Sequence, residues 1–534
     1  MTQDLIRAAA EELLRHQPLP GGVVVAVDRD RTLFTLPFGH ADPDRRTPTR
    51  DTHLFEIGSI SKLLTSVLIG QLVDDGRLDL DDRTLDHLPW LSAGPHTGAI
   101  TVGRLLAHTS GLISGSDAVP DAAAQVWTLR DRDAAPPGAH FHYSNVGYLV
   151  LGEIVRALTG EPHWTVLRRR VFVPLGMRDA LARVTHADRP LLAVGSTPAR
   201  DDRPWLPGDP LVPSTWLEVD GADGNVALDA AGLGTLLRLL LGDGAVDGHR
   251  VISAESWRRV TTATAPDGED VVAPPGSLPV SLSRYGLGVN VERIAGADCV
   301  THGGGMIGYG SFVLADRTNG VAVGALTNAD GDCLAAQLLA RFAHQVLIAD
   351  APPQLPDFDP AVRAGELADL AGLRGTDVAG EPVEVELGAD GDRALVHAGG
   401  ASGRIYRDPY ARLATDHPAL RLHWLYRPVE PSASSAEPRA SAAQLTTLPG
   451  HYRAHTPWFA NFRIVAREDR LWLTACRGVE APTADQQLVP IDGDTFRIGA
   501  APWLPERLTC RAVVDSRAVL LDLDGCGYSR TGTQ

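Results

Sequence analysis

Ser59 and Lys62 stand three residues apart in the segment EIGSISKLLTS, and Lys62 is the only lysine of the chain. Of the 49 lysine and arginine residues, all except Lys62 are arginine. A lysine amine can release its proton when it is desolvated, whereas an arginine guanidinium stays protonated. Because positions i and i+3 share one face of a helix, the amine could take the proton of the serine hydroxyl. The pair predicts a nucleophilic serine with a lysine base. The alternative is that the three-residue spacing arose by chance and that the scarcity of lysine reflects only an arginine-rich composition.

Two further segments carry groups that could complete such a site. FHYSNVGYLVLGEIV contains Tyr143 and Asn145, and THGGGMIGYGSFV contains His302, Gly303 and Gly304. A loop tyrosine alone is more often a packing residue, and a glycine run before a strand is usually a turn. The ordered combination with the serine–lysine pair is hard to obtain by accident, so we treat all of these residues as one constellation.

The elements that must position this constellation can be read from hydrophobic patterns. Segments 22–28 and 31–38 predict strands, and residues 60–73 predict a helix that is apolar almost all round and therefore buried. The serine would lie at the start of that helix, where unpaired N–H groups and the helix dipole favour developing negative charge. Further helices are expected at 146–158 and 230–241, with more strands before residue 330. This pattern indicates an α+β catalytic domain over 1–350 whose single sheet is assembled from distant segments.

The C-terminal part of the chain has a different pattern. Short alternating strands separated by Gly, Asp and Pro predict antiparallel β structure, and EPSASSAEPRASAA resembles a linker. We expect a small barrel over 351–430, a linker at 431–444 and a second barrel over 445–534. One larger barrel over 351–534 is the alternative.

Composition excludes several classes of function. The formal charge of −17 over 534 residues argues against nucleic acid or an anionic membrane surface as a partner. No run approaches 18 apolar residues, and the first residues lack the pattern of a secretory signal. The five cysteines include no CxxC pair, which favours reduced thiols and a cytoplasmic location.

The quoted segments, together with LLAHTSGL and YGLGV, resemble the penicillin-recognising serine acyl-transferases. This family includes class C β-lactamases, D,D-carboxypeptidases, D-aminopeptidases, related esterases and the thioesterases that release or cyclise nonribosomal peptides. The resemblance covers residues 20–350 and implies a β-lactamase/transpeptidase-like domain, an antiparallel sheet flanked by helices. The tail more loosely resembles the lipocalin-like barrels that follow this domain in D-aminopeptidases and peptide-cyclising thioesterases.

The resemblance also implies roles for individual residues. The serine would become acylated, the lysine would take its proton, and the tyrosine would pass that proton to the leaving group. An oxyanion hole would use two backbone N–H groups, and the glycine strand would lie against the substrate backbone. Asp223 would contact substrate, although a turn or helix-capping role is an equal alternative. The implied catalytic residues are Ser59, Lys62, Tyr143 and His302, and the implied substrate and oxyanion residues are Asn145, Gly303, Gly304, Gly305 and Asp223.

One departure from the family pattern bears on the substrate. Many members carry Lys-Thr-Gly where this chain has His302-Gly303-Gly304. A lysine there holds the substrate carboxylate, whereas a histidine with a reference pKa near 6.5 is only partly charged at neutral pH. We therefore expect an amide, ester or thioester substrate without a required free carboxylate, and no antibiotic-hydrolysing activity.

These observations predict a serine hydrolase or acyltransferase for peptidyl substrates, with the D-residue preference of the family. A thioesterase that releases or macrocyclises a nonribosomal peptide, with a carrier protein of a peptide synthetase as partner, is the first prediction. A D-aminopeptidase, D-stereospecific amidase or esterase is the alternative, and a non-catalytic binding or sensor module is the alternative of another class. No cofactor is expected, and the absence of an HxxxH or Cys/His pair argues against a metal site.

Overall fold

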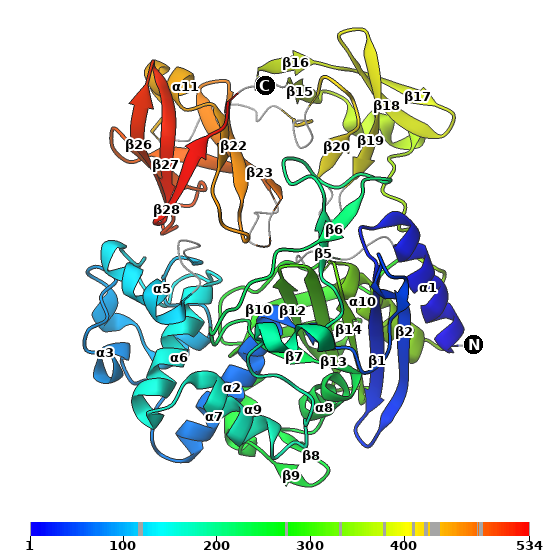
Figure 1. Ribbon diagram of the computed structural model, residues 1–534, viewed down its shortest axis with the longest axis vertical. Helices are drawn as coiled ribbons and strands as arrows, with labels where there is room; N and C mark the ends of the chain where they lie inside the picture. Colours follow the sequence, from blue (N-terminus) through cyan, green and yellow to red (C-terminus); the bar gives the residue numbers. More distant parts are fainter. Residues whose placement is uncertain are drawn as a thin grey trace. The chain divides into compact units, whose positions relative to one another are not determined.

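The computed structural model describes residues 2–115, 121–272, 276–329, 334–377, 381–407, 412–420, 425–427, 438–477, 479 and 484–532. The chain forms two compact units. The first comprises Met1–Thr197 and Leu211–Phe358, and the second comprises Pro198–Pro210 and Asp359–Gln534. A helix-flanked antiparallel sheet in the first unit and a closed β-barrel near the C-terminus confirm the expected fold class (Figure 1).

An eight-stranded antiparallel sheet forms the centre of the first unit, in the order β10-β11-β12-β13-β14-β1-β2-β3. Strands from both ends of the unit meet in its middle, where Val24 of β1 lies opposite Ala325 of β14. β1 is rich in valine and buried at every position except its last, as suits a strand covered on both faces. The strands are β1 (Gly21–Asp28), β2 (Thr32–Asp42), β3 (Thr47–Pro48), β10 (Val280–Tyr285), β11 (Asn290–Ile294), β12 (Ala297–Met306), β13 (Tyr309–Asp316) and β14 (Val321–Thr327).

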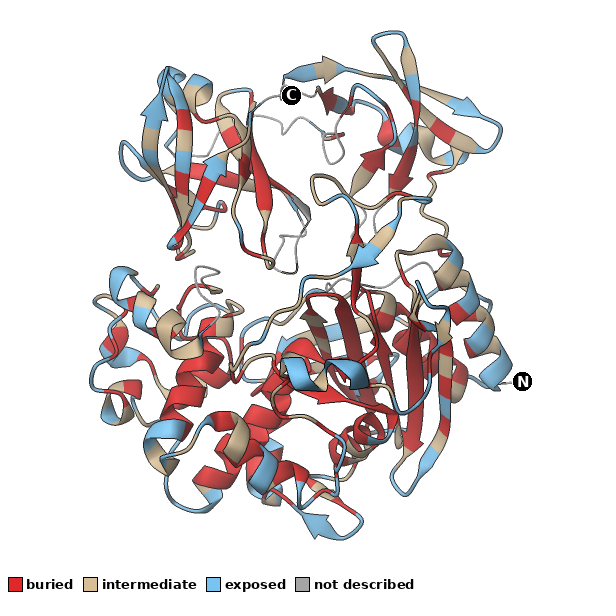
Figure 2. Ribbon diagram, in the orientation of Figure 1, coloured by how far each residue is buried: buried red, intermediate tan, exposed pale blue. Residues whose placement is uncertain are grey.

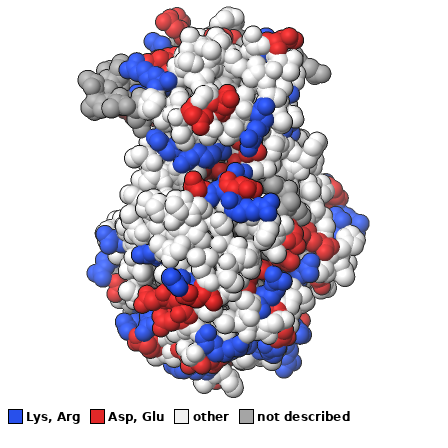
Figure 3. Space-filling model, turned by 90° about the vertical axis from the view of Figure 1, so that its left-hand side faces the viewer, with Lys and Arg blue, Asp and Glu red and all other residues white. Residues whose placement is uncertain are grey.

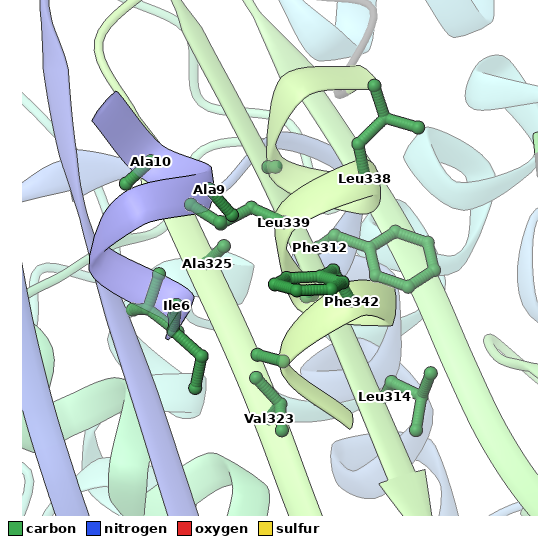
Figure 4. Packing of buried hydrophobic residues seen from close by; sticks show 14 of the residues in the cluster. Ile6, Ala9, Ala10, Phe312, Leu314, Val323, Ala325, Leu338, Leu339 and Phe342 are labelled. Atoms are coloured by element: carbon green, nitrogen blue, oxygen red, sulfur yellow. The ribbon is translucent and has the colours of Figure 1, made fainter. Parts of the chain in front are cut away.

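The N-terminal helix α1 (Thr2–His16) and helix α10 (Leu334–Ile348) pack on one face of this sheet. Figure 4 shows Ile6 of α1 and Phe342 of α10 together with Phe312 of β13 and Val323 of β14, and all four side chains belong to one buried cluster. Small residues such as Ala9 let the two helices approach each other closely. The apolar faces of two helices from opposite ends of the unit therefore fix the sheet from one side.

A buried ion pair links α10 to the sheet. Arg341 of α10 donates from Nη2 to both carboxylate oxygens of Glu292 on β11, each at 2.9 Å. Arg341 is 8% exposed and Glu292 is 2% exposed. The hydroxyl of Thr301 also donates to Glu292 Oε1, at 2.7 Å. A carboxylate that accepts several charge-assisted bonds tolerates burial, but it depends strongly on its partner.

The helical part of the first unit is built around α2 (Ser61–Asp74) and α6 (Asn145–Thr159). The predicted all-round burial of α2 is confirmed, since only its last two residues are not buried, and Figure 2 shows the helix almost entirely red. The C-cap of α2 is Asp75, which Gly76 follows, and the C-cap of α6 is Gly160 in the left-handed conformation. Other elements of the unit are α3 (Thr84–His87), α4 (Val102–Leu106), α5 (Ala122–Thr128), α7 (His163–Leu167), α8 (Ala230–Leu241), α9 (Ala254–Val260), β4 (Phe55–Glu56), β5 (Ser196–Pro198), β6 (Leu211–Pro213), β7 (Ala227–Leu228), β8 (Ala245–Val246) and β9 (His249–Arg250).

In the second unit, strands β21 to β28 close into a barrel. The described residues between 359 and 427 form a two-stranded sheet, β15–β16, and a four-stranded sheet, β17 to β20, rather than a second closed barrel. The first half of the expected linker, residues 431–437, lies outside the described residues. The domain boundaries expected from the sequence remain predictions. The elements are β15 (Arg374–Thr376), β16 (Pro382–Glu384), β17 (Glu386–Asp390), β18 (Arg393–Ala398), β19 (Ala401–Arg407), β20 (Leu413–Thr415), α11 (Ala442–Thr447), β21 (Gly450–Arg453), β22 (Asn461–Arg467), β23 (Arg470–Arg477), β24 (Gln486–Pro490), β25 (Thr495–Ile498), β26 (Arg507–Val514), β27 (Arg517–Leu523) and β28 (Cys526–Arg530).

The segment Pro198–Pro210 interrupts the sequence of the first unit but packs within the second. Arg453 of β21 forms an ion pair with Asp201, and Asn461 of β22 donates to the Asp201 carbonyl at 2.9 Å. Leu206 is buried against Tyr406 and Ala414. This segment therefore supplies both polar and apolar contacts to the second unit, a feature that the sequence did not indicate.

Among the described residues, no helix has the length and apolarity that a membrane crossing requires. Acidic and basic side chains are interspersed over the face shown in Figure 3. Cys299, Cys510 and Cys526 are free thiols. Cys333 and the side chain of Cys476 lie outside the described part of the chain.

Candidate active site

Ser59 lies in a short 3₁₀ helix, η1 (Gly58–Ile60), that leads directly into α2. Gly58 has φ +49°, and a Cβ added there would lie 2.3 Å from the carbonyl oxygen of Gly305. Only glycine combines this backbone conformation with such a close approach. Glycine at position 58 therefore allows the loop that carries Ser59 to pack closely against β12.

Lys62 is 0% exposed, and the groups within hydrogen-bond distance of its amine include a hydroxyl, a side-chain amide and a backbone carbonyl. Nζ lies 2.8 Å from Ser59 Oγ, 2.8 Å from Asn145 Oδ1 and 3.1 Å from the backbone carbonyl of Asp223. The amide oxygen and the carbonyl can only accept hydrogen bonds. An amine that has lost its proton could donate to these two acceptors and accept the proton of the Ser59 hydroxyl at its lone pair. This arrangement is suited to proton abstraction from Ser59.

Asn145 is placed by the first turn of α6. The Ser144 hydroxyl caps this helix by accepting a hydrogen bond from the Gly147 N–H at 3.1 Å. The backbone N–H of Asn145 donates to the carbonyl of Ser114 at 2.7 Å. Two separate anchors thus hold the residue whose side-chain oxygen reaches Lys62.

Tyr143 lies just before this cap and is partly buried. Lys62 Nζ lies 4.9 Å from the centroid of its ring. The ring stacks on that of His108, with 4.1 Å between the centroids and 30° between the planes. The structure therefore brings Tyr143, Asn145, Lys62 and Ser59 together, as the sequence-based constellation requires.

Asp223 reaches the site through its backbone. Its carbonyl oxygen accepts from Lys62, as described above. Its carboxylate lies near Gly221, where an added Cβ would be 2.3 Å from Asp223 Oδ1. Burial raises the pKa of this carboxyl group, and Lys62 acts in the opposite direction. Contact between its carboxylate and substrate remains a prediction, while the carbonyl contact was not predicted.

The glycine run of β12 packs against the nucleophile loop. A Cβ on Gly304 would lie 2.0 Å from the carbonyl oxygen of Ile57, so glycine is required at this position. Ser311 of β13 donates from its hydroxyl to the same Ile57 oxygen at 2.8 Å. Gly303 and Gly305 are both partly exposed on this strand. The close approach holds the backbone of β12 beside Ser59, where an oxyanion hole formed by Ser59 and Gly305 is expected.

His302 is 0% exposed and neutral. Its Nδ1 lies 2.5 Å from the Gly303 carbonyl, which can only accept, so Nδ1 carries the proton. Nε2 then accepts from the Tyr285 hydroxyl at 2.7 Å. Burial lowers the pKa of His302 to about 3. The expectation of a partly charged imidazole at neutral pH is therefore wrong, because the ring is enclosed; a direct catalytic role for it remains a prediction.

Glu269 lies near this histidine and adds a titratable group to the surroundings of the site. Its Oε2 lies 3.9 Å from His302 Nε2 and accepts from Asn290 Nδ2 at 2.9 Å. Burial raises the pKa of Glu269 to about 8, against the lowering effect of Lys62. Much of the Glu269 population is therefore protonated at neutral pH.

Comparison with known protein families identifies the family of this chain. The model of the family described as "Beta-lactamase" matches residues 6–347. The chain belongs to the beta-lactamase family. This membership confirms the resemblance seen in the sequence and supports serine hydrolase or acyltransferase chemistry.

Relatives of this beta-lactamase family member extend the comparison. Penicillin-binding protein 4 of Amycolatopsis lactamdurans is 34% identical over 257 residues, covering 46% of this chain and 66% of that protein. Protein flp of Staphylococcus aureus strain MW2 is 27% identical over 195 residues, covering 35% of this chain and 39% of flp. The matches therefore span less than two thirds of either relative.

Solved structures of low identity show the same fold. The octameric penicillin-binding protein homologue from Pyrococcus abyssi aligns with a TM-score of 0.59 and 18% identity, over 89% of this chain and 98% of that one. The class C beta lactamase from Rhodobacter sphaeroides gives 0.52 and 21%, over 65% and 100%. The D-amino acid amidase from Ochrobactrum anthropi SV3, in its complex with D-phenylalanine, gives 0.52 and 23%, over 65% and 97%.

One group of described side chains in this family member has metal-ligand chemistry that the sequence reading missed. Cys299, Asp316 and His344 are buried with their ligand atoms within 4.8 Å of one another. His344 Nε2 lies 2.9 Å from Asp316 Oδ2, and Asn319 donates to both oxygens of that carboxylate. These hydrogen bonds account for the buried carboxylate without a metal. The residues are far apart in sequence, so no spacing motif could have revealed them.

Three other residues near the site were not predicted as functional, namely His108, Tyr285 and Ser311. His108 and Tyr285 occur in LLAHTSGL and YGLGV, segments that support the family resemblance. Their roles depend on contacts across the fold that single-sequence patterns do not encode. The ring of Tyr285 lies 4.8 Å from that of His108, so these two residues form a common aromatic layer behind Tyr143.

Proposed function

We propose that this protein is a serine acyl-transfer enzyme that attacks the carbonyl carbon of a D-residue in a peptidyl amide, ester or thioester. The observation that carries this proposal is the 2.8 Å contact between Nζ of the fully buried Lys62 and Oγ of Ser59, which is only partly buried. A nucleophile within hydrogen-bond distance of a base that is itself held by further groups is the arrangement required for covalent catalysis.

In the proposed reaction, Ser59 Oγ attacks the substrate carbonyl while its proton moves to Lys62 Nζ. The resulting oxyanion would be stabilised by the backbone N–H groups of Ser59 and Gly305. Tyr143 relays a proton to the leaving group, the bond to that group breaks, and an ester on Ser59 remains. Water or an amine then attacks the ester and gives up a proton to Lys62 and Tyr143, and a proton from these groups passes to Ser59 Oγ as the acyl group leaves. Preorganised donors of this kind contribute about 10²–10³ in rate each.

The neutral His302 supports a substrate class without a required carboxylate. Its pKa of about 3 and its 0% exposure leave no positive charge at this position at neutral pH. A fixed cation is needed to hold a carboxylate strongly. We therefore propose amides, esters and thioesters as acyl donors, with turnover largely independent of a distal carboxylate.

Two more specific functions are distinguished by the nucleophile that attacks the acyl-enzyme, either water or an amine. Attack by water would give a D-stereospecific amidase or aminopeptidase, a reading that agrees with the D-amino acid amidase among the proteins of this fold. Attack by an amine of the same substrate would give a macrocyclising thioesterase that receives its substrate from a carrier protein. The sequence-based preference for the thioesterase, like the cytoplasmic location, stays a prediction.

The test uses a linear peptidyl thioester in two forms, one ending in a D-residue and one in the matching L-residue. Mass spectrometry of the intact protein should find an acyl group on the wild type with the D-form and none on Ser59→Ala. Product analysis then separates free acid from cyclic amide. If neither stereoisomer acylates the folded protein and a fluorophosphonate fails to label Ser59, the enzyme proposal is wrong and a binding or sensor module is favoured.

A further inference from the structure

His108 lies two residues beyond helix α4 and is 0% exposed. Four aromatic rings surround it, and the closest centroid, at 4.1 Å, is that of Tyr143. Tyr285 and Tyr148 follow at 4.8 and 5.1 Å. Phe141 completes the set at 6.0 Å, with its plane nearly perpendicular. His108 is therefore the central ring of an aromatic cluster whose members are buried or partly buried and which includes the proposed proton relay, Tyr143.

His108 contacts each residue of the tripeptide 142–144. Its backbone carbonyl accepts from the N–H of His142 at 2.8 Å, and its Nδ1 accepts from the N–H of Ser144 at 3.0 Å. Between these two bonds, its ring stacks on the ring of Tyr143. The backbone on both sides of Tyr143 and the Tyr143 side chain are thus all fixed by one residue.

Two features of His108 are unfavourable for folding. It has φ +55°, in the left-handed region that residues other than glycine adopt rarely. Because Nδ1 accepts a hydrogen bond, the neutral ring carries its proton on Nε2, and Nε2 is buried without a hydrogen-bond partner among the described residues. Strained or unsatisfied groups of this kind concentrate at functional sites.

We propose that His108 is a positioning residue that holds Tyr143 and Asn145 in register with Lys62; this inference rests on the proposed acyl-transfer function. Lys62 Nζ lies 4.9 Å from the Tyr143 ring and 2.8 Å from Asn145 Oδ1. Tyr143 lies within the tripeptide that His108 anchors, and Asn145 follows it directly in the chain. Displacement of such groups by about 1 Å lowers rates by about 10²-fold. His108 does not itself contact the reacting atoms.

Two substitutions separate the ring from the acceptor. His108→Asn supplies an oxygen that can replace Nδ1, and asparagine tolerates positive φ, but the stacked ring is lost. His108→Gly also tolerates this φ, yet it removes both the ring and the acceptor. Both variants lack the stacked ring and tolerate this φ, but only His108→Asn keeps a side chain with an acceptor for the Ser144 N–H.

With a p-nitrophenyl ester as substrate, we expect kcat to fall by about 10²-fold in His108→Gly and by about tenfold in His108→Asn, with KM changed less than threefold. The matched control is His417→Asn, because His417 is also buried and its Nδ1 also accepts backbone N–H bonds, from Ala419 and Leu420 of the second unit. This control should lower the melting temperature without lowering kcat. Equal kcat in wild type and His108→Gly would overturn the positioning role.

A measurement independent of turnover separates this inference from the proposed function. In protein labelled with ¹³C-tyrosine, the Tyr143 signal among the nine tyrosines can be assigned by its loss in Tyr143→Phe. His108→Gly should shift this signal, because the stacked ring is removed, and His417→Asn should not. If the wild type forms no acyl-enzyme, the proposed function fails and this signal alone decides the positioning role; an unchanged Tyr143 signal refutes it.

Discussion

Replacement of Lys62 by arginine or methionine tests the proposed base most directly. Arginine keeps the positive charge but cannot accept a proton, whereas methionine keeps the approximate length of the side chain and removes the amine. General-base catalysis contributes about 10²–10⁴ in rate, which is about 2.7–5.4 kcal/mol of transition-state stabilisation. Because Lys62 acts on the nucleophile itself, we expect the acylation rate to fall by at least the upper figure in both variants.

The three contacts of Nζ also set the effect on folding. Methionine would leave Asn145 Oδ1 and the Asp223 carbonyl without their lysine donor, at a cost of about 1–3 kcal/mol for each buried acceptor that finds no new partner. Loss of the buried amine offsets part of this cost. Lys62→Met should therefore fold with a free energy of unfolding reduced by at most a few kcal/mol, while arginine must also fit a larger group into a side-chain site that is 0% exposed.

The assay is the burst of p-nitrophenol from an activated ester, followed by the intact mass of the acyl-enzyme. Circular dichroism and a denaturant titration confirm that each variant is folded. Ser59→Ala provides the value for complete loss. An acylation rate of folded Lys62→Arg within about tenfold of the wild type is incompatible with a base role for Lys62.

Three other substitutions test separate features. Gly304→Ala places a Cβ 2.0 Å from the Ile57 oxygen and should lower the acylation rate by about 10²-fold, whereas Gly98→Ala, with no atom within 4 Å, should not; equal rates would show that β12 does not position the nucleophile loop. Burial raises the pKa of Glu56 to about 8, so the folded state retains a proton that the unfolded state releases, and stability should fall by about 1.4 kcal/mol per unit as pH rises from about 4.5 to 8. Glu56→Gln should flatten this dependence in melting curves, and an unchanged slope would contradict the raised pKa. Arg341→Met leaves Glu292 buried without its ion-pair partner and should cost about 3–5 kcal/mol in a denaturant titration, while the double variant with Glu292→Leu should recover much of that loss; no recovery would mean that the pair is not the cause.

The hydrophobic and capping patterns of the sequence correctly predicted the features that depend only on residues close together in the chain. The helix expected at 230–241 has those bounds in the structure, because a run of leucines is preceded by a capping aspartate, Asp229, and followed by Gly242. The contact between Ser59 and Lys62 was also predictable, since helical geometry alone brings positions i and i+3 together.

Features that depend on burial or on distant segments were not predictable. The charge of His302 was misjudged because the sequence does not show that its ring is enclosed and that Tyr285 occupies its Nε2. The contact between the backbone carbonyl of Asp223 and Lys62 depends on the path of the backbone, which cannot be inferred from the residue types. His108 belongs to a segment already noted in the sequence, but its contacts arise only when residues more than 30 positions away fold against it.

The placement of the segment Pro198–Pro210 in the second unit has a consequence for the design of truncated proteins. A protein truncated after residue 358 would lack the partners of Asp201 and Leu206 and would expose this segment on the remaining fragment. Expressing the tail alone would omit the same segment from its own interior. Chimeras in which the second unit is exchanged between homologues should therefore exchange this segment with it. A chimera that does not would expose apolar side chains such as Leu206, and we expect it to aggregate.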